Sequence, residues 1–410
     1  MPLANMTKRL HELHVNFELY LTMPTTLATS LPIPGPDAAQ HSARLIEAIK
    51  HDISSQDGWI PFSRYMELAL YAPGLGYYTA GAHKFGEAGD FITAPELSAL
   101  FGRTLARQVA GIMAQTAPFI LELGAGSGKL AADMLSELER LGTLPEQYCI
   151  LEVSADLRER QQAMIRLRLP HLIDLVHWLD VLPEKINGAV IANEVLDALP
   201  VHLVRWQDSA INEIGVGLSE DGFIWQERKI IDGALLQASA RIAAADNYVS
   251  EICLAARGMI SSLACRLNQG AMLFIDYGFG AREYYHPQRT AGTLMCHYRH
   301  RAHDDPFFLP GLQDITAHVN FTDIAETGID AGLELLGYTN QAFFLINNGI
   351  AELLSEMSPE NLREYLPLSA QLQKLTSPAE MGELFKVIAM GKNMANPLSG
   401  FACGDLSRLL

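Results

Sequence analysis

The sequence predicts an α/β fold with a mostly parallel sheet, because short apolar runs end in glycine or an acid and helical patterns follow them. Residues 119–123 form such a run, and glycines follow it at alternate positions, Gly124, Gly126 and Gly128. Residues 129–141 then carry apolar side chains at helical spacing. Strand, glycine loop and helix therefore follow one another, as in the first unit of an open parallel sheet.

Other apolar runs are expected to supply the remaining strands of this sheet. They are 148–152, 175–180, 188–193 and 271–278, with 337–345 as a late strand that completes the sheet. Helices are expected ahead of the sheet at 38–52, 62–71 and 95–115, the last of them with proline at its start.

Changes of pattern divide the chain into six expected parts. These are a flexible N-terminal extension (1–37), a helical cover and lid (38–116), a first core part (117–205), an inserted hairpin and helices (206–268), a second core part with a substrate loop (269–350) and C-terminal helices (351–410). The insertion is expected because 206–227 alternates apolar residues and contains glycines, as a hairpin does, while 234–267 has a helical pattern.

The spacing of the glycines indicates which ligand the loop would hold. A dinucleotide loop needs glycine at the sixth position from Gly124, where this chain has Lys129, and a phosphate loop needs Ser or Thr where it has Leu130. Glu122 followed by alternate glycines instead resembles the first motif of Rossmann-like methyltransferases, which bind S-adenosylmethionine. A glycine-rich turn without a ligand is the alternative.

Polar residues at the ends of neighbouring strands are expected to complete a cofactor site. Glu152 follows the second strand, where a βαβ unit places the acid that binds ribose hydroxyls. Asp180 follows the third strand and is expected near the adenine, or else forms a turn. The predicted cofactor-binding residues are Thr93, Pro95, Glu122, Gly124, Ala125, Gly126, Gly128, Glu152, Ser154, Asp180 and Asn193.

Residues 74–96 are expected to form a lid over the ligand. Glycines, aromatic side chains and two acids, Asp90 and Glu96, occur there together before a helix. In the alternative, the two acids only complement the N-terminus of that helix.

The amino-acid composition limits the kinds of partner and of cross-link that we expect. A formal net charge of -17 argues against nonspecific nucleic-acid binding, which relies on clustered Lys and Arg. Five cysteines without paired spacing indicate neither disulfides nor a zinc site, and we expect reduced thiols. No apolar run approaches the ~20 residues of a transmembrane helix, and the N-terminus lacks the pattern of a signal or transit peptide.

Several segments occur in the order seen in the MidA-like family of S-adenosylmethionine-dependent methyltransferases, which the chain resembles from about 60 to 350. They are GDFITAPELS (89–98), ELGAGSG (122–128), ANEVLDALP (192–200), IDYG (275–278) and DITAHVNFT (314–322). That family includes the mitochondrial assembly factor of respiratory complex I that methylates an arginine on a complex I subunit.

The resemblance implies a class I methyltransferase core with a mostly parallel seven-stranded sheet, an N-terminal helical cover and an inserted lobe. It also implies S-adenosylmethionine as cofactor and arginine on a protein substrate as acceptor, with a link to complex I assembly. The chain is similar to bacterial-type members, so a cytoplasmic location is expected before the mitochondrial matrix. A homodimer is a further expectation.

Glu194 and Asp197 are the predicted catalytic residues. A guanidinium stays protonated in water because its pKa is above ~12, so a carboxylate must orient it and localise its charge. The i, i+3 separation places both carboxylates on one side if a helical turn follows the strand. In the alternative, Asp197 caps the next helix and Glu194 only borders the strand.

The sequence leaves alternatives open for its histidines and for its function. The tract 284–305 is rich in His and aromatic residues, but it lacks a recognised metal-ligand spacing, and we expect a substrate-facing loop without a metal. His318 is expected to be a hydrogen-bonded structural residue, with a proton acceptor as the alternative. The alternative functions are methylation of a small molecule at nitrogen or oxygen and a non-catalytic assembly factor on the same scaffold.

Overall fold

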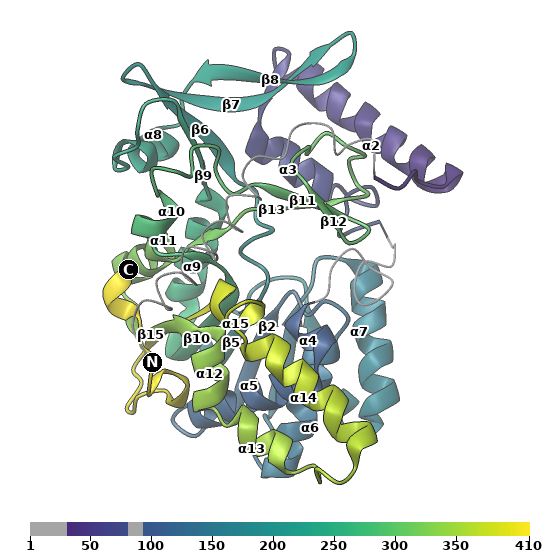
Figure 1. Cartoon of the computed structure of the whole chain (residues 1–410), viewed down its shortest axis with the longest axis vertical. Helices are drawn as coiled ribbons and strands as arrows, with labels where there is room; N and C mark the ends of the chain where they lie inside the picture. Colours follow the sequence, from purple (N-terminus) through teal and green to yellow (C-terminus); the bar gives the residue numbers. More distant parts are fainter. Residues whose placement is uncertain (1–30, 81–92) are drawn as a thin grey trace, which may run out of the picture.

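The computed structural model describes residues 31–80 and 93–410, and its centre is a mixed sheet between layers of helices (Figure 1). The strands in spatial order are β15 (Glu334–Asn340), β16 (Phe385–Lys392), β10 (Leu267–Phe279), β5 (Ile186–Asn193), β2 (Phe119–Leu123), β3 (Gln147–Leu151) and β4 (Val176–Leu179), and β14 (Val319–Asn320) also pairs with β10. From β10 to β4 neighbouring strands are parallel, whereas β16 is antiparallel to β10 and β15. The predicted α/β fold is confirmed, with a mixed eight-stranded sheet in place of the seven strands expected.

Helices cover both faces of this sheet because its central strands are apolar on both sides. In β2, Ile120 packs among side chains of α5 (Ala99–Met113) and α6 (Lys129–Leu141), while the next residue, Leu121, belongs to the core under α9 (Leu254–Arg266) and α11 (Phe321–Asp330). Successive side chains of a strand point to opposite faces, so one apolar run supplies two cores. The carboxyl ends of the parallel strands are left for a ligand.

A second sheet of five strands lies at the top of the view in Figure 1 and packs against α2 (Pro36–Ser55) and α3 (Phe62–Tyr71). Its strands are β1 (Trp59–Pro61), β7 (Ala210–Ser219), β6 (His202–Gln207) and β9 (Tyr248–Ile252), with β8 (Gly222–Lys229) paired to β7. β1 pairs with β7, where Ile60 faces Val216. The expected N-terminal cover and the expected inserted lobe therefore share one apolar core.

Two expected helices are interrupted. The helix predicted over 234–267 breaks at β9, because that segment pairs antiparallel with β6 instead. The helix predicted over 95–115 is divided at Ser98, whose Oγ accepts a hydrogen bond from the Leu100 amide (3.3 Å) and so starts α5. A separate short helix, α4 (Ala94–Leu97), precedes it.

The C-terminal part also differs from the prediction. The late strand predicted over 337–345 ends at Asn340, whose side chain accepts a hydrogen bond from the Phe343 amide (2.9 Å) and begins α12 (Gln341–Asn347). The part expected to hold only helices contains β16, which lies inside the central sheet between β10 and β15.

The remaining elements are short or peripheral. They are α7 (Ala155–Arg168), α8 (Gly233–Ala240), α10 (Ala281–Tyr284), α13 (Ile350–Ser355), α14 (Leu362–Thr376), α15 (Met381–Leu384), β11 (Met295–Tyr298), β12 (Arg301–His303), β13 (Asp314–Thr316) and single 3-10 turns at Pro170–Leu175, Ser399–Phe401 and Ser407–Leu409.

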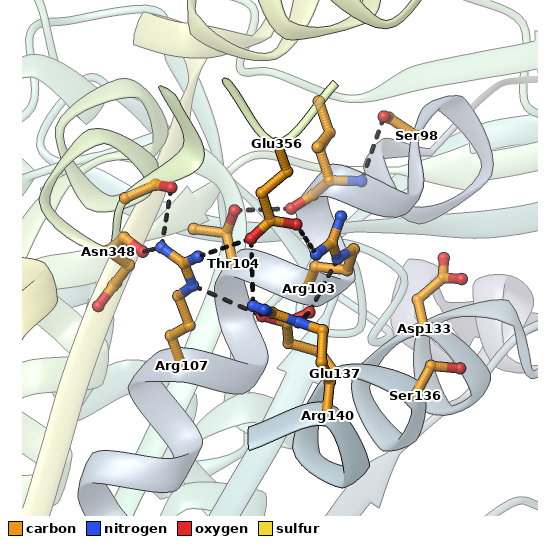
Figure 2. Close-up of polar contacts among 12 residues, drawn as sticks. Ser98, Arg103, Thr104, Arg107, Asp133, Ser136, Glu137, Arg140, Asn348 and Glu356 are labelled. Carbon is orange, nitrogen blue, oxygen red and sulfur yellow. Dashed lines mark hydrogen bonds and ion pairs between the residues drawn. The ribbon is translucent and has the colours of Figure 1, made fainter. Parts of the chain in front are cut away.

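An ion-pair cluster joins α5, α6 and the segment after α13 (Figure 2). Glu137, whose side chain is 1% exposed, is 2.9 Å from Arg103 Nε, 2.5 Å from Arg140 Nη2 and 3.6 Å from Arg107 Nε. Glu356 reaches the same guanidinium groups from the other side, at 2.6 Å from Arg103 Nη2 and 3.3 Å from Arg140 Nη2. These five side chains are called the Glu137 cluster below.

Some predictions fall on residues outside the described ranges. They include the N-terminal extension up to residue 30 and residues 81–92, with Asp90 and the start of the GDFITAPELS segment. Within 31–80 and 93–410, every helix is too short or too polar to span a bilayer.

Candidate functional site

A cavity of about 1130 Å³ lies at the carboxyl ends of β2, β3 and β5. The loops after these strands form one side of it, and α3 with residues after it forms the other. Most of the predicted site residues line this cavity: Thr93, Pro95, Glu122, Gly124, Ala125, Gly126, Glu152, Ser154, Asn193, Glu194 and Asp197. Gly128 and Asp180 lie outside this lining.

The glycine loop after β2 needs glycine for two different reasons. Gly124, Gly126 and Gly128 have φ angles of 63°, 53° and 83°, in the left-handed region that favours glycine. A Cβ on Gly126 would meet no protein atom within 4 Å, so the backbone there is open to the cavity. A Cβ on Gly128 would come within 2.9 Å of the Gln161 Cα, so this glycine allows the loop to pack on α7.

Gln161 connects the glycine loop to Glu152. Its Nε2 donates to the Gly126 carbonyl (3.0 Å) and to Glu152 Oε2 (2.9 Å), while its Oε1 accepts from Trp178 Nε1 (2.9 Å). Gln161 is not among the residues predicted from the sequence. A signal was present, because Gln161 is the polar member of the buried stripe that also contains Leu157 and Ile165.

The two acids at the ends of β2 and β3 are buried and hydrogen-bonded. Glu152 Oε1 accepts from the Ser154 amide (2.9 Å), and burial raises the pKa of Glu152 although these hydrogen bonds oppose the shift. Glu122 Oε2 accepts from Tyr148 Oη (2.8 Å), and burial raises the pKa of Glu122 to about 7. Both carboxylates are therefore fixed in orientation at the edge of the cavity.

Asp180 does not reach the cavity. Its side chain is 84% exposed, and Oδ1 accepts from Arg158 Nη2 (2.9 Å). The same guanidinium donates to the carbonyls of Glu152 and Leu179, so it joins the ends of β3 and β4. The structure thus gives Asp180 a place in a surface ion pair, apart from the other predicted cofactor residues.

The segment that contains Thr93 and Pro95 is attached to the glycine loop. Lys129 Nζ donates to the Pro95 carbonyl (2.5 Å) and to Asp133 Oδ2 (2.8 Å), and Ser127 Oγ donates to Glu96 Oε1. The helix α4 is therefore held against the start of α6, with Thr93 and Pro95 on the cavity wall.

Glu194 and Asp197 lie together at the end of β5, but the turn between them is not helical. Glu194 has φ 53°, which is uncommon for a residue other than glycine. Asn193 Nδ2 donates to Glu194 Oε1 (3.1 Å), while Asn193 Oδ1 and Asp197 Oδ1 are buried without a hydrogen-bond partner among the described residues. The predicted pair faces one cavity through a strained turn, and no helix begins there for Asp197 to cap.

The environment keeps these two acids from ionising easily. Burial and the charge of Asp197 raise the pKa of Glu194 to about 8. Burial also raises the pKa of Asp197, against the effect of a hydrogen bond from Tyr277. A carboxyl group with these properties is ready to receive a cation, because a nearby positive charge favours its ionised form.

Two tyrosines form an aromatic wall beside the acids. The rings of Tyr71 and Tyr78 are stacked at 5.5 Å, and both residues line the cavity. Tyr71 Oη donates to the Ala198 carbonyl (3.0 Å), and Tyr78 Oη donates to Asp314 Oδ1 (3.0 Å). Aromatic side chains were expected from the segment of Tyr78, whereas Tyr71 was expected only as the end of a helix.

The charges of the lining are strongly unbalanced. Its acids are Glu67, Glu96, Glu122, Glu152, Glu194 and Asp197. Arg64 is already paired with Asp52 (3.1 Å) and Glu67 (2.9 Å), and lysine is absent from the described lining. The cavity is therefore suited to positively charged ligands.

The histidines singled out in the sequence lie outside this cavity. Burial lowers the pKa of His297 and of His303, and lowers the pKa of His318 to about 3, so His318 is neutral. In 31–80 and 93–410 no group of three His, Cys, Asp or Glu side chains is placed to hold a metal ion.

Comparison with known proteins agrees with this geometry. Residues 104–339 match the model of a family described as S-adenosyl-L-methionine-dependent methyltransferases. The mitochondrial protein arginine methyltransferase NDUFAF7 homolog of Drosophila melanogaster is 30% identical, over 81% of this chain and 82% of its own length. The mitochondrial protein arginine methyltransferase NDUFAF7 of Danio rerio is 29% identical, over 84% of this chain and 89% of its own length.

A solved structure is similar over almost the whole chain. It is the crystal structure of a Burkholderia thailandensis protein bound to S-adenosyl-homocysteine, which is 49% identical with a TM-score of 0.90 and covers 93% of this chain and 100% of its own.

Proposed function

The chain belongs to the MidA-like family of S-adenosylmethionine-dependent methyltransferases, and we propose that its methyl acceptor is an arginine side chain of a protein substrate. The observation that carries the proposal is the acidic end of the cavity, where Glu194 and Asp197 lie beside Tyr71 and Tyr78 without a basic partner in the described lining. The names of the Drosophila melanogaster and Danio rerio relatives support arginine as the acceptor.

The residues present fit the cofactor. Gly126 offers an open backbone in the cavity wall, and Glu152 presents a fixed carboxylate suited to ribose hydroxyls. The buried Asn193 Oδ1 lacks a partner among the described residues and is available as an acceptor. When bound, S-adenosylmethionine supplies a methyl group on a positively charged sulfur. Glu122 also lines the cavity, and a bound positive charge would favour its ionised form, because burial raises its pKa to about 7 in the ligand-free protein.

The acceptor end fits a guanidinium group. Carboxylates bind the planar guanidinium through charge-assisted hydrogen bonds, and aromatic rings attract cations over their faces. Glu194 is protonated to a large extent near neutral pH in the ligand-free protein, since its pKa is raised to about 8, and a bound guanidinium would favour its ionised form. The nitrogen that gains a methyl group must lose a proton, and Glu194 is placed to accept it.

The location of the protein in the cell and the protein that it methylates are also proposed from the family resemblance. We infer a cytoplasmic protein whose substrate is a subunit of a respiratory complex, as the resemblance to the complex I assembly factor suggests. A homodimer is part of this proposal.

The test is transfer of a labelled methyl group from S-adenosylmethionine to proteins of a cell extract, followed by identification of the modified side chain. We expect label on arginine. Glu194→Gln should keep its cofactor affinity in calorimetry but lose transfer by a factor on the order of 10²–10⁴, because it removes a general base.

Glu67→Gln is the matched control. Glu67 lines the same cavity, but its side chain is 52% exposed and paired with Arg64, so its loss should leave transfer near the wild-type rate. Label on a small molecule would replace the proposed substrate class. Unchanged transfer by Glu194→Gln would show that the acceptor is held by other groups.

A further inference from the structure

The IDYG segment ends the central strand β10, yet it has no role in the proposed chemistry so far. Its acid, Asp276, is 1% exposed and does not line the cavity. β10 lies beside β5, where Ile275 faces Asn193. Asp276 therefore sits directly behind the turn that carries Glu194 and Asp197.

The carboxylate of Asp276 is bonded to the backbone of that turn. Oδ2 accepts from the amides of Leu196 (2.9 Å) and Asp197 (3.2 Å), and Oδ1 accepts from the Tyr277 amide (2.9 Å). The turn is also held at its start, because the Glu194 amide donates to the Ile275 carbonyl (2.9 Å). β10 thus fixes both the beginning and the end of the segment 194–197.

Such fixing is needed because Glu194 has an unfavourable backbone conformation. A non-glycine residue at φ 53° relaxes to negative φ unless surrounding contacts hold it. Relaxation would turn the Glu194 side chain away from its present direction. The bonds from Asp276 oppose this change without contact between Asp276 and the cavity.

We propose that Asp276 is a positioning residue, whose carboxylate holds the amides of Leu196 and Asp197 and thereby keeps Glu194 and Asp197 directed into the cavity. The consequence for turnover rests on the proposed function, because the direction of these acids matters only if they receive the methyl acceptor. The hold on the turn itself does not depend on that function.

The hydrogen bonds explain why a carboxyl group suits this position. Three N–H groups converge on its two oxygens, and both oxygens accept although burial and the charges of Asp197 and Glu194 raise the pKa of Asp276 well above its usual value. An asparagine would replace one oxygen with an amino group, which would face a backbone donor. Asp276→Asn therefore removes part of the hold while it changes the side-chain volume very little.

The test compares Asp276→Asn with Glu251→Gln in the full chain. Glu251 is a matched control because it is also a buried carboxylate (2% exposed) that accepts from two successive amides, Thr293 (2.7 Å) and Leu294 (3.0 Å), but it does not line the cavity. The measurements are hydrogen exchange, calorimetric titration with S-adenosyl-homocysteine, and labelled-methyl transfer at varied S-adenosylmethionine.

We expect Asp276→Asn to speed exchange in 194–198 and to lower kcat by more than about tenfold, with cofactor affinity and KM for S-adenosylmethionine within about twofold of wild type. Glu251→Gln should speed exchange around 292–295 instead and keep kcat. If Asp276→Asn does not fold, Asp276→Ser serves in its place, since the smaller hydroxyl still accepts one hydrogen bond.

Unchanged exchange in 194–198, or loss of cofactor affinity equal to the loss of kcat, would overturn the proposal. If wild type transfers no methyl group, the proposed function fails. The exchange comparison still decides in that case whether Asp276 holds the turn.

Discussion

Gly126, Gly128 and Gly142 share a left-handed backbone conformation but differ in their surroundings. Gly126 and Gly142 both have positive φ, 53° and 69°, and a Cβ on either would meet nothing within 4 Å. Gly126 lines the cavity, whereas Gly142 ends α6 and is absent from the lining. Gly128 also has positive φ, but it is restricted further by its contact with Gln161.

Gly126→Val should abolish saturable binding of S-adenosylmethionine. The branched side chain would fill space in the cavity wall, in addition to the backbone strain of about 1–3 kcal/mol that positive φ imposes. Gly142→Val carries a comparable strain away from the cavity, so it should lower the melting temperature and keep the affinity. Calorimetric titration of both variants separates the two effects, and normal affinity in a folded Gly126→Val protein would contradict the assignment of the loop.

The sequence allowed prediction of several cavity-lining residues from local pattern, while the roles given to them stay predictions. Glu122, Gly124, Gly126 and Glu152 lie at or just after strand ends, and strand ends can be read from apolar runs. Tyr71 bonds to Ala198 across the fold, and its spacing carries no sign of this partner. The spacing of Gln161 marks it as a polar residue in a buried stripe, but it does not indicate that Glu152 is its partner. Asp180 lies in a turn that directs it to Arg158 and solvent, and its place near the adenine stays a prediction.

At the scale of elements, the Glu137 cluster joins parts of the chain that are far apart in sequence. Arg103 and Arg107 come from α5, Glu137 and Arg140 from α6, and Glu356 from the segment after α13 (Figure 2). Burial alone would raise the pKa of Glu137, but hydrogen bonds from Arg140 and Arg103 lower it. The cluster therefore stabilises the packing of α5 on α6 as long as Glu137 is ionised.

Glu137→Gln should destabilise the protein by about 1–3 kcal/mol near pH 7, since it removes the buried carboxylate shared by the three guanidinium groups and leaves the more exposed Glu356 as their remaining acid in the cluster. A carboxyl whose pKa is lower in the folded protein contributes stability above its unfolded pKa of about 4.3 and loses it as pH falls through the folded value. The difference from wild type should therefore shrink in acid. Glu139→Gln on the same helix, at a 42% exposed side chain, is the control for chemical denaturation, and an equal loss there would argue against the cluster.

Element prediction from the sequence succeeded for local patterns and failed for long-range pairing. The helices at 62–71 and 129–141 were expected with the bounds that the structure gives. β1, β9 and β16 were missed, because the partner of each strand lies far away along the chain. Pairing across such distances depends on the completed fold and leaves little trace in local periodicity.

For the whole molecule, the excess of acid extends into the cavity where a cationic ligand would bind. The chain carries a formal charge of -17, and its cavity holds Glu122 and Glu194, whose pKa values are raised to about 7 and about 8. Ionisation of either acid lowers the free energy of unfolding of the ligand-free protein, because burial disfavours the charged carboxylate. The stability of the folded protein therefore depends on pH.

Thermal stability of the ligand-free protein should fall as pH rises from about 5 to about 8. In this range the folded protein holds protons that the unfolded chain has released, and stability falls with rising pH wherever the folded state binds more protons. Melting temperatures over a pH series test this expectation. Glu194→Gln should flatten the slope, while Glu67→Gln, at an exposed side chain, should keep it. Equal slopes for wild type and Glu194→Gln would exclude a raised pKa for Glu194.

The position of β16 has a consequence for the synthesis of the protein. This strand ends at Lys392 in a chain of 410 residues, yet it lies between β10 and β15 in the central sheet. While the ribosome is still making the chain, β10 lacks its neighbour on that side, and its apolar edge stays open. Domains usually fold as they emerge from the N-terminus onward. Here β10, at 267–279, must wait for residues 385–392 before its edge is covered, and during that interval a chaperone that covers open strand edges would protect the nascent enzyme.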